Sequence, residues 1–334
     1  MKNKKRKAGS MQDLLNRNID YLRISVTDRC NLRCVYCMPK EGIASVPHED
    51  VLTYEEIIRI CECASHLGIN KIKLTGGEPL VRPGFTELVR KIKALPLIQQ
   101  VTLTTNGILL YDMLDELCEA GLDAVNISLD TLNPERFEEI TGADGLNRIL
   151  KALDKALEIG IHVKINVLPV RELNGDGYTE LVALAKDRPV DVRFIELMPL
   201  GCGRGLTPVY SDEIKEILRQ TYGPLTPYKG RAGNGPAEYY LLEGFTGKTG
   251  FISAVSHEFC AACNRVRLTS TGFLKLCLNY DTGIDLKDPM RGGIGDTELT
   301  NLIHNAILHK PVHHNFLGTD EDNRESKGMS QIGG

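Results

Sequence analysis

Apolar positions along the chain follow two alternating patterns. Short runs rich in β-branched and other apolar residues are typical of strands, and longer stretches with apolar residues every three or four positions are typical of helices. The runs predict strands at residues 21–26, 71–75, 101–104, 124–128, 162–168 and 191–197. The stretches between them predict helices at residues 54–67, 85–94, 111–120, 146–159 and 178–186, with Gly68, Gly121 and Gly160 at their C-caps.

The order of these elements predicts the fold class. Strands that alternate with helices form βαβ units around a parallel sheet, and right-handed crossovers in one direction curl such a sheet. The six units therefore predict an α/β protein built as a partial (βα)6 barrel of the TIM type. The chemistry of such folds lies at the carboxyl ends of the strands, and here polar or glycine-rich sequence follows the strands at residues 27–30, 75–79, 104–107 and 128–130. We expect the active residues to converge on that face.

The strand–helix alternation fades at about residue 205, where proline- and glycine-rich sequence begins. A chain of 334 residues exceeds the usual size of one domain, so we expect a barrel core at residues 11–205 and a smaller C-terminal domain at residues 206–334. Residues 1–10 are basic and are predicted to form a disordered arm. No apolar signal segment follows this arm and no transmembrane run is present, so the expected location is the cytoplasm, without membrane contact.

Charge and cysteine content point toward metal chemistry. The net charge of −4 gives no general attraction to polyanions, so nucleic-acid binding is not expected and a nucleotide contact needs a local basic cluster. Ten cysteines in a long chain without an export signal indicate reduced thiolates that bind metal rather than disulfides. Six of the cysteines form two groups, Cys30, Cys34 and Cys37 in the first and Cys260, Cys263 and Cys277 in the second.

The first cysteine triplet, Cys30-x-x-x-Cys34-x-x-Cys37, lies in a loop directly after a predicted strand. Electron-transfer iron–sulfur clusters take four thiolates, whereas this loop offers three and would leave one iron open to a small molecule. The alternative is a zinc site completed by another histidine or cysteine, but the loop contains no fourth ligand.

The first triplet together with Thr75-Gly-Gly-Glu-Pro79 resembles the radical S-adenosylmethionine (SAM) superfamily. The resemblance implies a barrel of the radical SAM type, a 4Fe–4S cluster on the three cysteines, and SAM chelating the open iron through its amino and carboxylate groups. Tyr36, Gly76, Gly77 and Glu78 would hold SAM. One-electron cleavage of SAM would then supply a 5′-deoxyadenosyl radical.

The second triplet, Cys260-x-x-Cys263 with Cys277, is compatible with two kinds of site. A zinc ribbon is one reading, and a second cluster with an open iron is the other, favoured because no fourth ligand is evident. Arg265 and Arg267 alternate beside these cysteines, so they share one side of an extended segment and suit a polyphosphate. The motif Lys310-Pro-Val-His-His314 holds further histidines, which we expect to be exposed.

Nearly the whole chain resembles one family of that superfamily, the GTP 3′,8-cyclases of molybdenum cofactor biosynthesis. The resemblance rests on residues 22–31, 37–39, 75–79, 104–107, 126–130, 193–196 and 260–268 and on the terminal pair Gly333-Gly334. It implies nucleotide contacts by Arg23, Lys73, Thr104, Lys164, Arg265, Val266 and Arg267, and SAM contacts by Tyr36, Gly77, Ser128 and Met198. It further implies that the open iron of the second cluster binds the guanine base, and that Gly333 and Gly334 enter the active site and belong with Cys30, Cys34 and Cys37 to the catalytic group. Several relatives carry arginine where Lys73 stands, so the charge is kept here but a bidentate phosphate contact is not.

The family resemblance also implies the reaction. The adenosyl radical would abstract the C3′ hydrogen of GTP, the ribose radical would attack C8 of the guanine, and reduction would quench the product radical to give (8S)-3′,8-cyclo-7,8-dihydroguanosine 5′-triphosphate. An electron donor of the flavodoxin or ferredoxin type and a downstream cyclic pyranopterin monophosphate synthase would be partners, and a homodimer is compatible with the family. Two alternatives stay open: a radical SAM peptide- or protein-modifying enzyme with an auxiliary cluster, and a zinc-ribbon nucleic-acid-binding protein.

Overall fold

The computed structural model describes residues 9–44, 46–230, 232–316, 318 and 325–332. Within these residues the centre of the molecule is one twelve-stranded sheet with the order β12-β11-β10-β1-β2-β3-β4-β5-β6-β9-β8-β7. Its middle consists of six parallel strands in chain order: β1 (Tyr21–Ser25), β2 (Lys71–Thr75), β3 (Gln100–Thr105), β4 (Ala124–Ser128), β5 (His162–Val167) and β6 (Val190–Ile195). The predicted strands agree with these to within two residues at each end.

The C-terminal part of the chain extends this sheet at both edges. Beyond β6 lies β9 (Thr249–Ile252), parallel to it, followed by the antiparallel strands β8 (Glu238–Leu241) and β7 (Thr226–Pro227). Beyond β1 lies β10 (Arg265–Leu268), also parallel, followed by β11 (Phe273–Lys275) and β12 (Gly283–Asp285). The strands at the two ends of the order, β12 and β7, are not paired with each other within the described residues. The sheet is therefore a partial barrel, as predicted, rather than a closed one.

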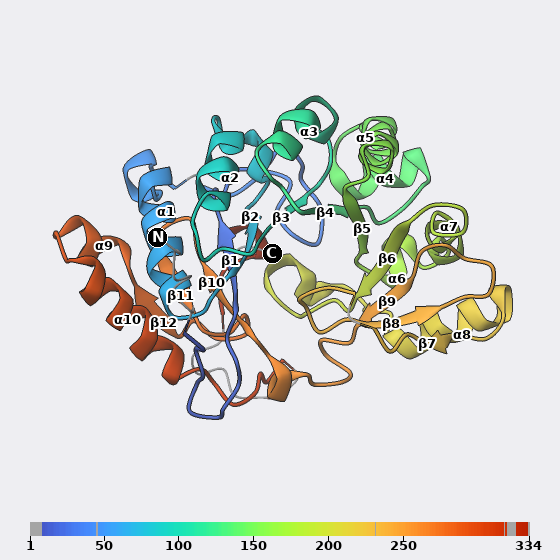
Figure 1. The fold of residues 1–334 in the computed structure, drawn as a ribbon. Helices are drawn as coiled ribbons and strands as arrows, with labels where there is room; N and C mark the ends of the chain where they lie inside the picture. Colours follow the sequence, from blue (N-terminus) through green and yellow to red (C-terminus); the bar gives the residue numbers. More distant parts are fainter. Residues whose placement is uncertain (1–8, 45, 231, 317, 319–324, 333–334) are drawn as a thin grey trace, which may run out of the picture.

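Helices cover the outer face of the sheet in an arc (Figure 1). The elements are α1 (Tyr54–His66), α2 (Phe85–Lys93), α3 (Leu110–Glu119), α4 (Pro134–Thr141), α5 (Leu146–Ile159), α6 (Arg171–Asn174), α7 (Tyr178–Ala183), α8 (Ser211–Tyr222), α9 (Lys287–Arg291), α10 (Asp296–Leu308) and α11 (Met329–Ile332). Short 3-10 turns lie at η1 (His48–Asp50), η2 (Pro79–Val81), η3 (Gly201–Gly205) and η4 (Cys260–Ala262). In Figure 1, α10 from the C-terminal part lies beside α1 from the N-terminal part.

The helix ends follow the local sequence. Thr53 and Glu56 form a capping box that begins α1, and Asn133 caps α4 immediately before a proline at its first position. The glycines predicted as C-caps, Gly68, Gly121 and Gly160, all have positive φ, at 101°, 91° and 82°. A residue with a Cβ is strained in that conformation, which explains glycine at these three helix ends.

The core lies between the sheet and the helices. Apolar residues of β1–β6 alternate with polar ones, and the apolar set packs against the buried faces of the helices in one continuous cluster. The polar set faces the opposite side. Among the described residues, none of the helices combines the length and the apolar composition that crossing a bilayer requires.

Candidate active site

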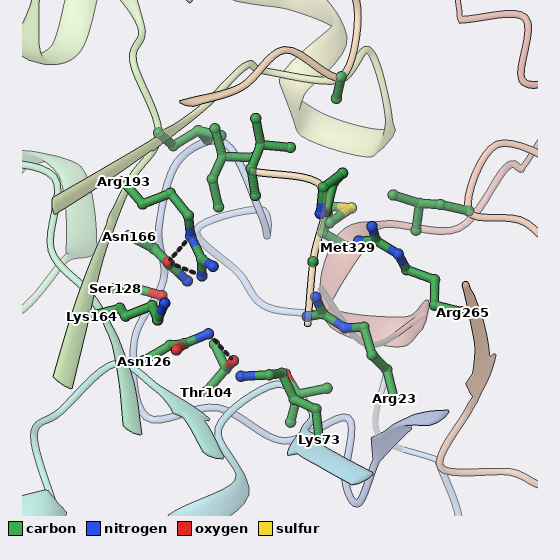
Figure 2. Close-up of a pocket in the computed structure, with 18 of the residues that line it drawn as sticks. Arg23, Lys73, Thr104, Asn126, Ser128, Lys164, Asn166, Arg193, Arg265 and Met329 are labelled. Atoms are coloured by element: carbon green, nitrogen blue, oxygen red, sulfur yellow. Dashed lines mark hydrogen bonds between the residues drawn. The ribbon is translucent and has the colours of Figure 1, made fainter. Parts of the chain in front are cut away.

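A cavity of about 630 Å³ lies on the inner face of the sheet. Successive side chains of a strand point to opposite faces, so every second residue of the central strands faces this cavity. Figure 2 shows the polar ends of these side chains directed toward one common space. The cavity-lining residues include Arg23, Lys73, Thr104, Asn126, Ser128, Lys164, Asn166, Arg193, Arg265 and Arg267, and all six cysteines of the two triplets line it as well.

Positive charge dominates the cavity. The lining contains eight lysines and arginines against two aspartates: Arg23, Lys73, Lys164, Arg193, Lys248, Arg265, Arg267 and Lys310 against Asp130 and Asp191. Burial, and then repulsion by Arg193 and Arg23, holds the pKa of Lys73 well below its usual value. Burial also lowers the pKa of Arg23 to about 10, with a smaller contribution from Arg265. Because these groups are destabilised in their charged form, a bound anion would stabilise the site.

Neutral amides hold two of these cations in place. With its amide oxygen facing the cations, Asn126 accepts hydrogen bonds from Lys73 Nζ at 2.8 Å and from Arg193 at 3.0 Å. On the next strand, Asn166 Oδ1 accepts a hydrogen bond from Arg193 Nε at 3.0 Å. An amide orients a positive group without cancelling its charge, so Lys73 and Arg193 keep their attraction for an anion.

Lys164 has a different environment at the other side of the cavity. Its ammonium donates to the Ala232 carbonyl and to the Tyr239 hydroxyl, the latter at 3.0 Å, and lies 3.5 Å from a carboxylate oxygen of Asp191. Asp191 is buried and lies 3.5 Å from Lys248 as well. The charge of Lys164 is therefore partly compensated within the protein, in contrast to that of Lys73.

The first triplet lies in the loop after β1, which packs tightly against the end of β2. The Gly77 N–H donates to the Thr27 carbonyl at 2.7 Å. A Cβ on Gly76 would lie 2.6 Å from the same carbonyl oxygen, and a Cβ on Gly77 would lie 2.7 Å from the Asp28 carbonyl oxygen. Both glycines also line the cavity. Glycine is required here because two backbone segments meet at a distance that leaves no room for a side chain.

Glu78 holds the ends of β2 and β3 together. Its buried carboxylate accepts hydrogen bonds from the Leu80 N–H at 3.0 Å, the Thr105 hydroxyl at 2.8 Å and the Asn106 N–H at 2.7 Å. Burial raises the pKa of Glu78 to about 7, against the opposing effect of these bonds. Glu78 is not among the described residues that line the cavity, so its side chain supports the glycine turn from behind.

Tyr36, between the second and third cysteines, is fixed by an aspartate. Its hydroxyl donates to Asp130 Oδ2 at 2.5 Å, and Asp130 Oδ1 accepts from the Leu168 N–H at 2.8 Å. Burial raises the pKa of Asp130 to about 6. Tyr36 and Asp130 line the cavity, as do Ser128 and Met198. The structure thus brings the predicted SAM residues, except the Glu78 side chain, to the cavity beside the first triplet.

The second triplet is formed by η4 and the residues after β11. The His314 N–H donates to Cys260 Sγ at 3.4 Å, a type of contact that stabilises sulfur ligands of metals. Burial raises the pKa of Cys263, but the positive charges of Lys310 and Arg265 outweigh it and lower the pKa overall. Burial raises the pKa of Cys260, so the nearby positive charges favour the thiolate form at Cys263 in particular.

The chemistry of both donor sets fits iron–sulfur clusters. Burial raises the pKa of Cys30, Cys34 and Cys37, that of Cys37 to about 12, so these sulfurs ionise only beside a positive centre such as a metal. Among the described residues, no three histidine, cysteine or carboxylate side chains converge as the ligands of one metal ion do.

Four of the predicted site residues do not line the cavity or lie outside the described residues, and Glu78 is one of them. Val266 is 1% exposed and belongs to the apolar core behind β10, so only its backbone is near the site. Gly333 and Gly334 lie outside the described residues, as does most of the predicted arm at residues 1–10. Sequence reasoning missed Asn126, Asn166, Arg193 and Asp191 as cavity residues. The sequence could have identified them, because each lies at one of the alternating positions of a predicted strand that face away from the apolar core.

Family models match two successive parts of the chain. The Radical SAM superfamily model matches residues 24–185, and the Molybdenum Cofactor Synthesis C model matches residues 190–316. Solved structures show the same fold at low identity. Streptococcus suis SuiB bound to S-adenosylmethionine is 16% identical with a TM-score of 0.60, covering 88% of this chain and 69% of SuiB.

Curated relatives match the chain from end to end. A GTP 3′,8-cyclase of Clostridium perfringens (strain 13 / Type A) is 48% identical over 325 residues, covering 97% of this chain and 100% of the relative. A GTP 3′,8-cyclase of Desulforamulus reducens is 47% identical over 328 residues, with the same coverage. One of Moorella thermoacetica is 44% identical over 327 residues, again with that coverage. The chain therefore belongs to the GTP 3′,8-cyclase family of the radical SAM superfamily.

Proposed function

We propose that this protein is a lyase that converts GTP into (8S)-3′,8-cyclo-7,8-dihydroguanosine 5′-triphosphate, the first step of molybdenum cofactor biosynthesis. The single observation that carries the proposal is a cavity lined by two cysteine triplets and by eight lysines and arginines against two aspartates. A triphosphate supplies the negative charge that this lining needs. Family membership agrees with that reading.

Membership of the radical SAM superfamily implies a 4Fe–4S cluster and SAM. Cys30, Cys34 and Cys37 would hold this cluster, and Tyr36, Gly76, Gly77, Ser128 and Met198 would form the SAM site beside it, with the backbone at Glu78. When bound, the cluster and SAM supply a 5′-deoxyadenosyl radical by one-electron cleavage. The chain itself contributes the geometry: the bond between Tyr36 and Asp130 fixes the tyrosine ring, and the bonds of Glu78 fix the glycine turn.

We propose that Cys260, Cys263 and Cys277 would hold a second 4Fe–4S cluster, which would offer one open iron to the guanine base. The positive charges of Lys310 and Arg265 favour the thiolate form of Cys263. The base would then be held at one end of the cavity while SAM occupies the other.

The triphosphate would lie along the row of cations between the two ends. Arg23 has Lys73 on one side and Arg267 on the other in the sheet register, and Arg265 lies two residues before Arg267. Thr104, Lys164 and the backbone at Val266 would add contacts. Charge-assisted hydrogen bonds to phosphate oxygens fix the nucleotide, so the ribose is held at a defined distance from the first triplet. Positioning is thus the main catalytic task of these side chains.

The C-terminal Gly333-Gly334 pair is proposed to enter the active site. It follows α11 directly, and Met329 and Ser330 of α11 line the cavity. A tail without side chains fits a narrow space near a bound nucleotide. We also propose a reductant of the flavodoxin or ferredoxin type, a cytoplasmic location, and delivery of the product to a cyclic pyranopterin monophosphate synthase.

The proposed function is tested by anaerobic reconstitution followed by incubation with SAM, dithionite and GTP. Formation of 5′-deoxyadenosine that requires GTP, together with a product of the mass of GTP that yields a fluorescent pterin after workup, supports the proposal. A peptide-modifying enzyme or a zinc-ribbon protein gives no such product. Deoxyadenosine release at the same rate with and without GTP contradicts the proposal.

A further inference from the structure

Residues 310–314, here named the 310–314 strap, are anchored by a buried arginine. Arg17 is paired with Asp13 at 2.6 Å, and both side chains are almost fully buried. The guanidinium of Arg17 donates to the carbonyls of Lys310 at 3.0 Å, Pro311 at 2.8 Å and Val312 at 3.1 Å. It also donates to the carbonyl of Cys260 at 3.1 Å. One side chain therefore joins the strap to the second cysteine triplet.

The strap also contacts that triplet with its own groups. The His314 N–H donates to Cys260 Sγ at 3.4 Å, and the Lys310 ammonium donates to the Leu276 carbonyl, next to Cys277. Both ends of the strap are thus fixed at the second triplet. These contacts fix the position of the His314 side chain.

The imidazole of His314 is a buried polar group that faces the cavity. His314 is 7% exposed, lines the cavity and lies 4.4 Å from the Phe316 ring, measured between ring centroids. Neither ring nitrogen has a partner of hydrogen-bond geometry among the described residues, and burial lowers the pKa of the imidazole against an opposing contact with the Ala254 backbone. A buried polar atom without a hydrogen bond destabilises the fold, so such a group is typical of a site that a ligand completes.

The hydrogen-bonding capacity of His314 differs from that of its neighbours. The charged cavity-lining side chains that act on the cysteines of the second triplet include Arg265, Arg267 and Lys310. Arginine and lysine only donate hydrogen bonds, whereas a neutral imidazole has one donor and one acceptor nitrogen. The guanine base carries an amino group that adenine lacks at the same position, and this group needs an acceptor.

We propose that His314 accepts a hydrogen bond from the donor edge of the guanine base and so contributes to selection of GTP over ATP. This inference rests on the proposed function, because it places the base at the second triplet. His314 would act on the substrate and not as a ligand of iron. The Arg17 contacts would hold the strap, and with it the imidazole, at the distance that the base requires.

The test compares two variants of His314 with a matched control. His314→Phe keeps a ring that can stack on Phe316 but removes both nitrogens, and His314→Asn restores an acceptor. His313→Ala removes the adjacent, exposed histidine. Dissociation constants for GTP and ATP are measured by anaerobic equilibrium dialysis on reconstituted protein, with iron content and melting temperature recorded for each variant.

We expect His314→Phe to weaken GTP binding about tenfold, the equivalent of one hydrogen bond of roughly 1.4 kcal/mol, with ATP binding and iron content unchanged. His314→Asn recovers part of the loss, and His313→Ala behaves as the wild type. Equal GTP affinity in folded, fully loaded His314→Phe overturns the inference, and so does a loss of iron, which would identify the imidazole as a metal ligand. If the wild type itself fails to bind GTP, the proposed function fails together with the inference.

Discussion

Arg23 on β1 stands directly opposite Arg267 on β10 in the parallel register, so two guanidinium groups lie side by side on the cavity face. The charge of Arg23 disfavours the charged form of Arg267. Burial holds the pKa of Arg267 well below its usual value, and the nearby charges of Arg23 and Arg265 lower it further. Like charges directly opposite each other in a sheet are destabilising. The pair adds to the positive charge of the cavity lining, which suits a polyanionic ligand.

Replacement of Arg267 by alanine should weaken GTP binding by about tenfold to a hundredfold, because a charge-assisted hydrogen bond contributes roughly 1.5–3 kcal/mol. Iron bound at the first triplet should not change. Titration calorimetry under argon checks the affinity at two salt concentrations. Arg188→Ala, which removes a surface arginine paired with Asp154, is the control and should bind GTP normally. Unchanged affinity in Arg267→Ala would exclude it from the triphosphate site.

The hydrogen bond between Tyr36 and Asp130 should support SAM binding. We expect Tyr36→Phe and Asp130→Asn each to weaken SAM binding several-fold while the first cluster is retained, because the ring loses its fixed orientation but its area remains. The Asn at position 130 can still accept the bond from the Leu168 N–H. If the two residues act as a pair, the double variant loses no more SAM affinity than the more damaging single variant does. Fully additive losses would show that they act independently.

Gly77→Ala should displace the first cysteine loop. The added Cβ would collide with the carbonyl oxygens of Asp28 and Arg29, and neither backbone group can move without shifting Cys30. We expect a lower melting temperature and incomplete loading of the first cluster, with the second cluster intact. Gly177→Ala is a matched control because nothing lies within 4 Å of its added Cβ. Normal iron content and stability in Gly77→Ala would contradict the close approach of β2 to the loop.

Arg17→Ala should loosen the second triplet. Four carbonyl oxygens would lose their donor and the buried Asp13 would lose its partner, so the expected loss is several kcal/mol of stability and part of the second cluster. Arg17→Lys keeps the positive charge but lacks the planar guanidinium with its several N–H donors, so it should restore little of the stability or of the second cluster. Iron content per chain measures the loss. Arg59→Ala, which breaks an exposed pair with Asp296, should leave both clusters intact.

The sequence predicts the central strands and their polar faces well because both depend on local alternation. Arg23, Lys73 and Lys164 stand on the same parity of three strands, and the structure places them on one face. The alternation along the strands also assigns Val266 to the core and Arg193 to the cavity, whereas the family resemblance placed Val266 among the nucleotide contacts and did not include Arg193. The direction of a side chain is therefore predicted better by its position in the strand than by its membership of a motif.

Other features depend on contacts between distant parts of the chain and have no local signal. The addition of β9 and β10 to the two edges of the six-stranded middle of the sheet joins residues that are far apart in sequence. The strand–helix alternation continues past residue 205 with α8, and the β7–β8 hairpin then interrupts it. His314 was expected at the surface. It is buried because Arg17 binds the strap, a relationship that spans nearly 300 residues.

The most direct test of the account is the iron content of the wild type and of two triple serine variants, one for each cysteine triplet, all reconstituted without oxygen. We predict about eight iron atoms per chain in the wild type and about four in each variant, with Mössbauer spectra that show one distinct iron site in each cluster. Zinc at the second triplet, or full iron content after its three cysteines are replaced, would contradict the account.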